Sequence, residues 1–281
     1  MERLSKIKDR VRNFNCGIWF LLIFLISLGL CVYIPRYMIG GTFKVGANVN
    51  YADETMYFTV EWKKFLQIIC LGPVFGIIYY TLMRVMLGKV DKTKGRNKYS
   101  VYLIEIGVVT FIALCSMAHL SHLGFEEVNL IDQTHGAVLS GPYQEQAVNA
   151  WYMDEWLGHT LIMFSYFMYL CLAVLAESLI SDHRKMKVEQ IVIVFIGAIG
   201  IAFLDGEVAF ASECGFFLLV SHIIFTIIAV VFVIVKKIKL IEHPILLAMI
   251  LSIIPLVYFN IVYIIENGIY SMYPFYSGNL S

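Results

Sequence analysis

The chain has 281 residues, of which 59% are hydrophobic and 15% charged, and its mean hydropathy is +0.76. Soluble globular domains carry about 25% charged residues, so this composition indicates a polytopic α-helical membrane protein. The formal net charge is zero, with 21 basic and 21 acidic residues, and gives no sign of nucleic-acid binding.

Seven segments are long and apolar enough to cross a bilayer, which takes about 20 largely apolar residues in a helix. The first follows the basic stretch MERLSKIKDRVR, and its length favours a retained helix over a cleaved signal peptide. No internal repeat or linker divides the chain, so residues 1–281 are predicted to form one all-α domain, a seven-helix transmembrane bundle. The predicted spans are 16–35, 65–87, 100–123, 156–180, 190–210, 214–235 and 244–265.

Basic residues are distributed unevenly between the connections of this bundle. Of the 21 Lys and Arg, 17 lie in the N-terminal tail and around the stretches LGKVDKTKGRNK, SDHRKMKVEQ and KKIKLIEH, which alternate with connections that hold four. Basic residues are retained on the cytoplasmic side during insertion. The sequence therefore predicts an inside N-terminus and an outside C-terminus, in a plasma or cytoplasmic membrane.

Two longer segments, 36–64 and 124–155, are predicted on the outer side. The first of them is too polar to cross the hydrocarbon core. It is expected to lie over the outer mouth of the bundle as a loop or a short interfacial helix. Trp62 would then sit at the depth of the lipid headgroups, where tryptophan is enriched.

Histidines gather in the outer half of the predicted bundle. His119 and His122 end the third span, His159 opens the fourth, and His222 lies within the sixth. At a rise of 1.5 Å per residue, His119 and His159 lie roughly 5 Å inside their outer helix ends, and His222 lies roughly 10 Å inside its own. Ionisable groups at membrane depth are costly, so they usually face a bundle interior and mark function.

The stretch WYMDEWLGHT adds two carboxylates, and Glu155 shares a helix face with His159 at i,i+4 spacing. Imidazole and carboxylate ligands suit a transition metal, and three protein ligands with an open position for water are typical of catalytic zinc. We therefore predict a metal site, with Zn favoured and Fe or Cu as alternatives. The predicted ligands are His119, His122, His159 and His222. Asp154 or Glu155 is predicted to act as a further ligand, as an orienting group or as the general acid or base.

Each of these residues also has a structural interpretation. His122 fits a solvated interfacial position, Asp154 fits a helix N-cap, and His222 fits a hydrogen bond to a neighbouring helix. Two further carboxylates, Glu105 and Glu177, lie near the inner ends of the third and fourth spans. They either reach the inner surface with their charged ends or extend a polar path for an ion or a proton.

In span number and orientation the chain is similar to the superfamily of alkaline ceramidases and adiponectin-receptor-like hydrolases. Those proteins hold zinc with one histidine on an early helix and an H-x-x-x-H pair on the last helix. The stretches CSMAH and DEWLGH look loosely similar, whereas the seventh span here contains no histidine. Glu155-x-x-x-His159 also resembles, in spacing, the copper-binding subunits of membrane monooxygenases, without their further downstream histidine.

The sequence thus predicts a metal-dependent, hydrolase-like membrane enzyme that acts on a lipid or amphipathic substrate at the outer leaflet. No H-E-x-x-H or G-x-S-x-G motif is present, which disfavours a zinc protease or serine hydrolase of those types. Two alternatives stay open. One is a transporter or channel for a cation or protons, with an acidic outer entry, and the other is a binding or sensory membrane protein without catalysis.

Overall fold

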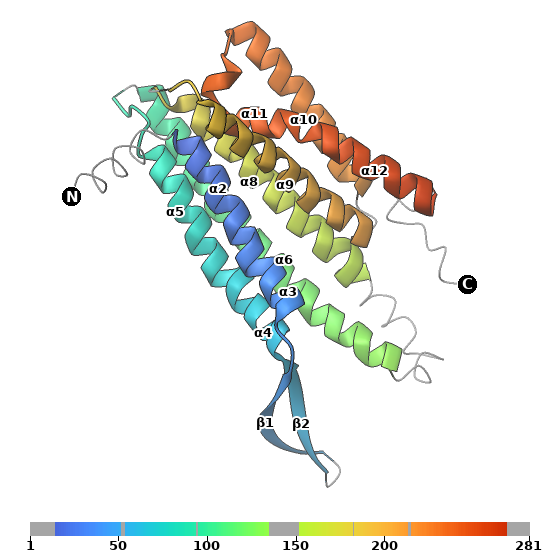
Figure 1. Ribbon diagram of the computed structural model, residues 1–281. Coiled ribbons are helices and arrows are strands. Elements are labelled where there is room, and N and C mark those ends of the chain that lie inside the picture. Colours follow the sequence, from blue (N-terminus) through green and yellow to red (C-terminus); the bar gives the residue numbers. More distant parts are fainter. Residues whose placement is uncertain are drawn as a thin grey trace, which may run out of the picture.

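The computed structural model describes residues 15–51, 54–93, 95–134, 152–181, 183–212 and 215–268. Its helices pack side by side into an elongated bundle, and a β-hairpin projects from one end (Figure 1). Within these ranges, six helical segments are long and apolar enough to cross a membrane, which indicates an integral membrane protein and confirms six of the predicted spans. They are Trp62–Leu87, Gly95–Phe125, His159–Leu179, Val188–Gly206, Phe217–Lys236 and Pro244–Glu266. A shorter apolar helix covers Cys16–Cys31.

The described helices are mostly continuous rods with local irregularities. The α-helices are α2 (Cys16–Leu28), α3 (Ile34–Met38), α4 (Trp62–Ile69), α5 (Phe75–Leu87), α6 (Gly95–Thr134), α8 (His159–Leu179), α9 (Val188–Ser212), α10 (Gly215–Lys236), α11 (Pro244–Leu251) and α12 (Ile253–Asn267). The π-helical turns are η1 (Gly29–Tyr33), η2 (Cys70–Val74) and η3 (Tyr152–Gly158), and η4 (Leu240–Glu242) is a short 3₁₀ turn. The turn η1 joins α2 to α3, η2 joins α4 to α5, and η3 leads directly into α8.

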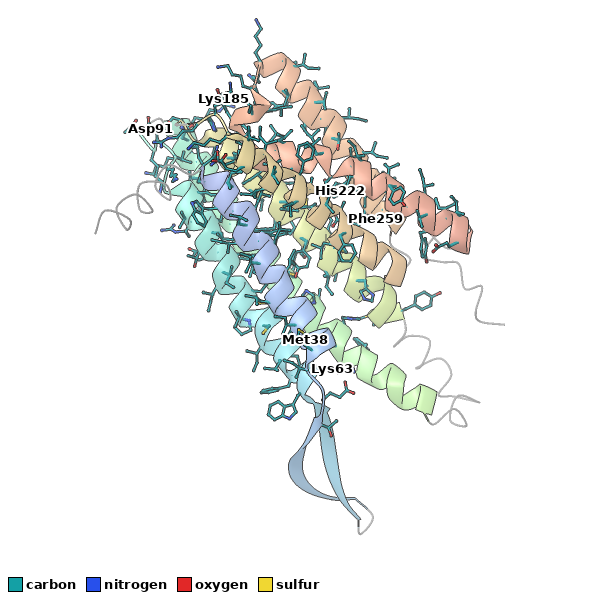
Figure 2. All side chains as sticks on the ribbon, viewed as in Figure 1. Met38, Lys63, Asp91, Lys185, His222 and Phe259 are labelled. Atoms are coloured by element: carbon teal, nitrogen blue, oxygen red, sulfur yellow. The ribbon has the colours of Figure 1, made fainter. Side chains whose placement is uncertain are left out.

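Most of the segment 36–64 forms two paired β-strands, so its prediction as a loop or interfacial helix was wrong. Strand β1 (Thr42–Tyr51) pairs antiparallel with β2 (Glu54–Glu61), with Thr42 opposite Glu61. The stretch TFKVGANVNY alternates apolar and polar residues, as does the end of ETMYFTVE from Phe58 to Glu61, and this is the period of a strand. The prediction considered the polarity of the segment and not this alternation. We call this end of the bundle the hairpin end and the opposite end the basic-loop end; Figure 2 labels Met38 and Lys63 at the former, and Asp91 and Lys185 at the latter.

Helix α6 is longer than the predicted third span, because it continues past His122 to Thr134. The segment 124–155 therefore begins as helix and ends in η3, while residues 135–151 of that prediction lie outside the described residues. Helical geometry already begins at Tyr152, so Asp154 lies within a helical turn. This contradicts the interpretation of Asp154 as an N-cap.

The core is held by aromatic side chains from three helices. Tyr79 of α5 stacks on Tyr169 of α8 with ring centroids 4.7 Å apart, and the Tyr169 hydroxyl donates to the Tyr79 carbonyl at 2.8 Å. Phe20 and Phe24 of α2 stack on the same two tyrosines. Helix α6 lies along α8, and α9 packs against α2, α10, α11 and α12. Helix α8 also contacts α9 and α11, and so links α6 to the helices around α9.

At the basic-loop end, Glu177 joins α8 to the start of α11. Its carboxylate oxygens accept hydrogen bonds from the backbone N–H groups of Ile245 at 3.1 Å and Leu246 at 3.0 Å. These are the first free N–H groups of the helix behind Pro244, and a carboxylate is stabilised there because it satisfies them and opposes the helix dipole. Gly17 of α2 packs directly on this junction. A Cβ atom at position 17 would overlap the Glu177 carboxylate and lie 2.6 Å from Cγ of Pro244.

We expect Gly17→Ala to lower the thermal stability of the purified protein, because the added methyl group must displace Glu177 or the start of α11. Overpacking of this kind costs about 1–3 kcal/mol. The matched control is Gly29→Ala in the same helical segment, where an added Cβ meets no atom within 4 Å. Equal melting temperatures for the two variants would contradict this account of the junction.

The connections at the basic-loop end are joined to one another by specific contacts. The Asn15 side chain caps α2 by accepting from the Gly17 N–H at 3.0 Å, and it donates to the Glu242 carbonyl at 3.2 Å. The imidazole rings of His183 and His243 lie against each other, with centroids 3.9 Å apart. Burial, reinforced by the neighbouring His183, lowers the pKa of His243 to about 4.

Acidification is therefore expected to destabilise this end of the bundle. His243 has a pKa of about 6.5 in an unfolded chain, so the unfolded state binds the proton more readily than the folded state. The stability associated with neutral His243 is complete above about pH 6.5 and is lost as the pH falls towards the native pKa of about 4. Melting temperatures measured across this range should fall less steeply for His243→Gln than for the wild type. Identical slopes would contradict the assignment.

Candidate histidine site

Two predicted ligands meet where α6 packs against η3 and the start of α8. Their imidazole rings, on His122 and His159, have centroids 4.2 Å apart and are tilted by 50°. The close approach depends on Gly158, because a Cβ atom there would lie 3.1 Å from the Cβ of His122 and 3.2 Å from the Met153 carbonyl oxygen. A larger residue at position 158 would move η3 away from α6 and separate the two rings.

His119 lies one turn before His122 on α6 and is buried, with 8% of its surface exposed. Its Nε2 atom lies 3.2 Å from the hydroxyl of Tyr166 on α8. His119 is close enough to His122 and His159 for electrostatic interaction with both. The structure thus brings three predicted imidazoles together between α6 and α8, and we call His119, His122 and His159 the histidine cluster.

The Tyr166 contact has a chemical consequence for His119. Metal-bound histidines usually use their second ring nitrogen for a hydrogen bond that fixes the orientation of the ring. In His119 the contact engages Nε2, which leaves Nδ1 as the nitrogen for a metal. A small cavity of about 10 Å³ lies beside this contact and is lined by Cys115, Ser165 and Tyr166, among others. That volume is roughly enough for one water molecule.

The two predicted acid–base residues, Asp154 and Glu155, lie within the π-helical turn η3. A π-helical turn has i→i+5 hydrogen bonds, so the i,i+4 rule that placed Glu155 and His159 on one face does not hold across it. The side chains of both acids lie outside the described part of the structure, and their roles stay predictions. Single π-helical turns occur frequently at functional sites, which makes η3 relevant to the cluster.

His222 belongs to a different polar group. On α10 its Nε2 atom lies 3.3 Å from Oδ2 of Asp205 on α9, and both side chains are 0% exposed. Its ring also packs on Phe167 of α8, with centroids 4.8 Å apart. Figure 2 shows His222 between the two ends of the bundle. The predicted ligands therefore fall into the histidine cluster and the Asp205–His222 pair. That His222 binds a metal stays a prediction, and because its Nε2 atom faces Asp205 we do not include it among the ligands proposed below.

The two carboxylates of the predicted ion path both make structural contacts. Glu105 of α6 forms an ion pair with Arg84 of α5. Glu177 holds the start of α11, as described above. These contacts account for both side chains without transport, and the ion-path hypothesis stays a prediction.

Across the described residues, no group of three His, Cys, Asp or Glu side chains is arranged to hold a metal ion.

Sequence reasoning missed Gly158, Tyr166 and the pairing of Asp205 with His222. Gly158 immediately precedes His159, and a glycine next to a predicted ligand is a usable signal for close helix packing. Tyr166 follows His159 by seven residues, which places both on one face of α8. The pairing of α9 with α10 through Asp205 has no local sequence signal, because it depends on how the two helices rotate against each other.

Comparisons with protein-family models, with curated proteins and with solved structures found no match. A functional assignment therefore depends on the residues of the site. The histidine cluster is the group of residues that supports the proposed function.

Proposed function

We propose that the chain crosses the membrane seven times, with its N-terminus and the basic loops inside and the hairpin and C-terminus outside. The shorter apolar helix Cys16–Cys31 supports a seventh span, because η1 and α3 continue it to Met38. Orientation is supported by the 17 of 21 Lys and Arg that belong to the N-terminal tail and the basic loops. On this topology the histidine cluster faces the outer leaflet.

Cysteine labelling in intact cells tests this topology. In a variant without native cysteines, a membrane-impermeant maleimide should label Gly40→Cys at the hairpin end. The same reagent should label Lys185→Cys, an exposed position in a basic loop, after permeabilisation only. Labelling of Lys185→Cys in intact cells would contradict the orientation.

For function, we propose a metal-dependent membrane enzyme that acts on a lipid or amphipathic substrate at the outer leaflet. The observation that carries this proposal is the contact between the His122 and His159 rings beside His119. Ionisable groups at membrane depth are usually functional, and three imidazoles match the ligand number of a catalytic zinc site.

Access from the lipid supports the substrate class. On α6, Met117 is 66% exposed and Leu120 is 48% exposed, and these residues flank His119 in the sequence. Phe164 of α8 is also exposed, two residues before Tyr166. A substrate with an acyl chain can lie along this apolar surface while its polar group reaches the cluster.

In this proposal His119, His122 and His159 hold the metal, with Zn favoured and Fe or Cu as alternatives. A bound metal of this kind supplies a polarised substrate oxygen and an acidified water. Tyr166 orients His119, and Gly158 sets the separation of α6 from α8. Asp154 or Glu155 on η3 would accept and return the proton during hydrolysis.

Elemental analysis of the purified protein tests the metal site. We expect about one transition-metal ion per chain, as for a catalytic site with three protein ligands. His122→Ala, His159→Ala and the double variant should lose the metal, because each substitution removes one of three ligands. Gly158→Ala should weaken metal binding without removing a ligand.

Two controls distinguish a ligand from a residue needed for folding. His183→Ala, at the basic-loop end, and His222→Ala should both keep the metal. Size-exclusion profiles and helical content should be the same for every variant compared. Metal-free wild-type protein, or metal that survives the double variant, would overturn the proposal.

A further inference from the structure

The interior of the bundle contains an acid and a base that the proposed metal site does not use. Asp205 of α9 and His222 of α10 face each other with Oδ2 and Nε2 3.3 Å apart. Neither side chain has any exposed surface. Charged or strongly polar groups at this depth are costly and usually functional.

The hydrogen bonding of this pair differs from that of a structural carboxylate. Glu177 is equally buried, yet both of its oxygens accept backbone hydrogen bonds of normal length. By contrast, both oxygens of Asp205 and both ring nitrogens of His222 have no hydrogen-bond partner among the described residues. The Leu218 carbonyl is near the His222 ring but does not reach hydrogen-bond geometry.

A buried polar pair contributes to stability only when its remaining hydrogen-bonding capacity is satisfied. The 3.3 Å contact leaves most of that capacity unused, so the pair is poorly explained as a structural tie between α9 and α10. Unsatisfied polar atoms in a native interior point to a water, an ion or a chemical role. The arrangement therefore indicates a site that takes up a small polar molecule.

A pocket between α8 and α10 lies next to the pair, on the far side of Phe167. Its volume is about 40 Å³, and its lining includes Thr160, Phe167, Leu218 and Ser221. Most of the lining is apolar, and Thr160 and Ser221 are its two hydroxyl-bearing residues. The volume is large enough for a water molecule. The Phe167 ring both lines the pocket and packs on His222, so it separates the pocket from the pair.

Two further hydroxyls without partners belong to the same region. The buried Oγ1 atoms of Thr160 and Thr226 have no hydrogen-bond partner among the described residues. Thr160 lies in the first turn of α8, and Thr226 follows His222 by one turn on the same face of α10. Unsatisfied polar atoms therefore occur at the pocket, at the pair and one turn beyond it.

We propose that Asp205 and His222 form an acid–base pair that exchanges its proton with water entering from the pocket between α8 and α10. The step is a proton transfer alone, in which the proton moves between the pair and a water molecule and no covalent bond between heavy atoms changes. Movement of the Phe167 ring controls the contact with water. Among the described side chains around the pair, Cys171 on α8 is a further titratable group that interacts with Asp205, and Phe259 of α12 packs at the adjacent Gly206.

Hydrogen–deuterium exchange at constant pH tests this proposal. The full-length protein, uniformly labelled with ¹⁵N and held in nanodiscs of neutral phosphatidylcholine, is moved into D₂O and followed by NMR. The ring N–H signal of His222 is assigned by its loss in His222→Gln. We expect it to exchange before the backbone amides of α9 and α10, and to shift in Asp205→Asn.

A pair of variants on α10 tests the route. Ser221→Phe fills the pocket and should slow the exchange of the His222 proton. Ile224→Phe adds a ring of the same kind at a 52% exposed position on the same helix and should leave the exchange rate unchanged.

Two results would overturn the proposal. One is a His222 proton in the wild-type protein that is as protected as the surrounding amides, since the pair would then be a closed structural contact. The other is the same exchange rate in Ser221→Phe and Ile224→Phe. Because His222→Gln is expected to retain the metal, failure here is distinguishable from failure of the proposed metal site.

Discussion

A bundle that lies in hydrocarbon has no solvent to satisfy its polar groups, so each one must find a partner within the protein. The backbone groups meet this requirement through the hydrogen bonds of the helices, whereas each polar side chain needs a partner of its own. A buried donor or acceptor without a partner costs about 1–3 kcal/mol. The way each buried side chain meets this constraint separates the structural residues of this protein from the candidate functional ones.

Three intramembrane carboxylates illustrate the difference. Glu177 accepts two backbone hydrogen bonds at the start of α11, and Glu105 pairs with Arg84 across α5 and α6. Asp205 instead faces His222 at 3.3 Å without the geometry of a hydrogen bond. Burial alone therefore does not distinguish these carboxylates, whereas their hydrogen bonding does.

Helix irregularities are concentrated around the half of α6 that carries the histidines. The π-helical turns η2 and η3 both pack against α6, and η2 also contacts η1. Pro73 lies within η2 and lacks the N–H that a regular helix needs. Each such turn shifts the faces of the following helix relative to regular α geometry. The positions of the histidine cluster consequently depend on where these turns occur, as well as on residue spacing.

Close helix contacts determine which of the potential ligands meet. Gly158 permits the approach that brings the His122 and His159 rings to 4.2 Å, and Gly17 permits α2 to pack on the junction of α8 and α11. Both glycines act through the absence of a side chain. Their importance is visible only when the opposing helix is in place.

By itself the sequence determined the membrane class, six spans that the structure reproduces within a few residues, and the clustering of basic residues in alternate connections. Hydrophobic length and charge are local properties that need no knowledge of neighbouring helices. The hairpin at 42–61 had a partial signal in the sequence, because its first strand alternates apolar and polar residues. Only the tertiary structure decided that His119, His122 and His159 meet while His222 pairs with Asp205. Helix rotation and packing distance set those contacts, and neither is encoded in the spacing of residues along one helix.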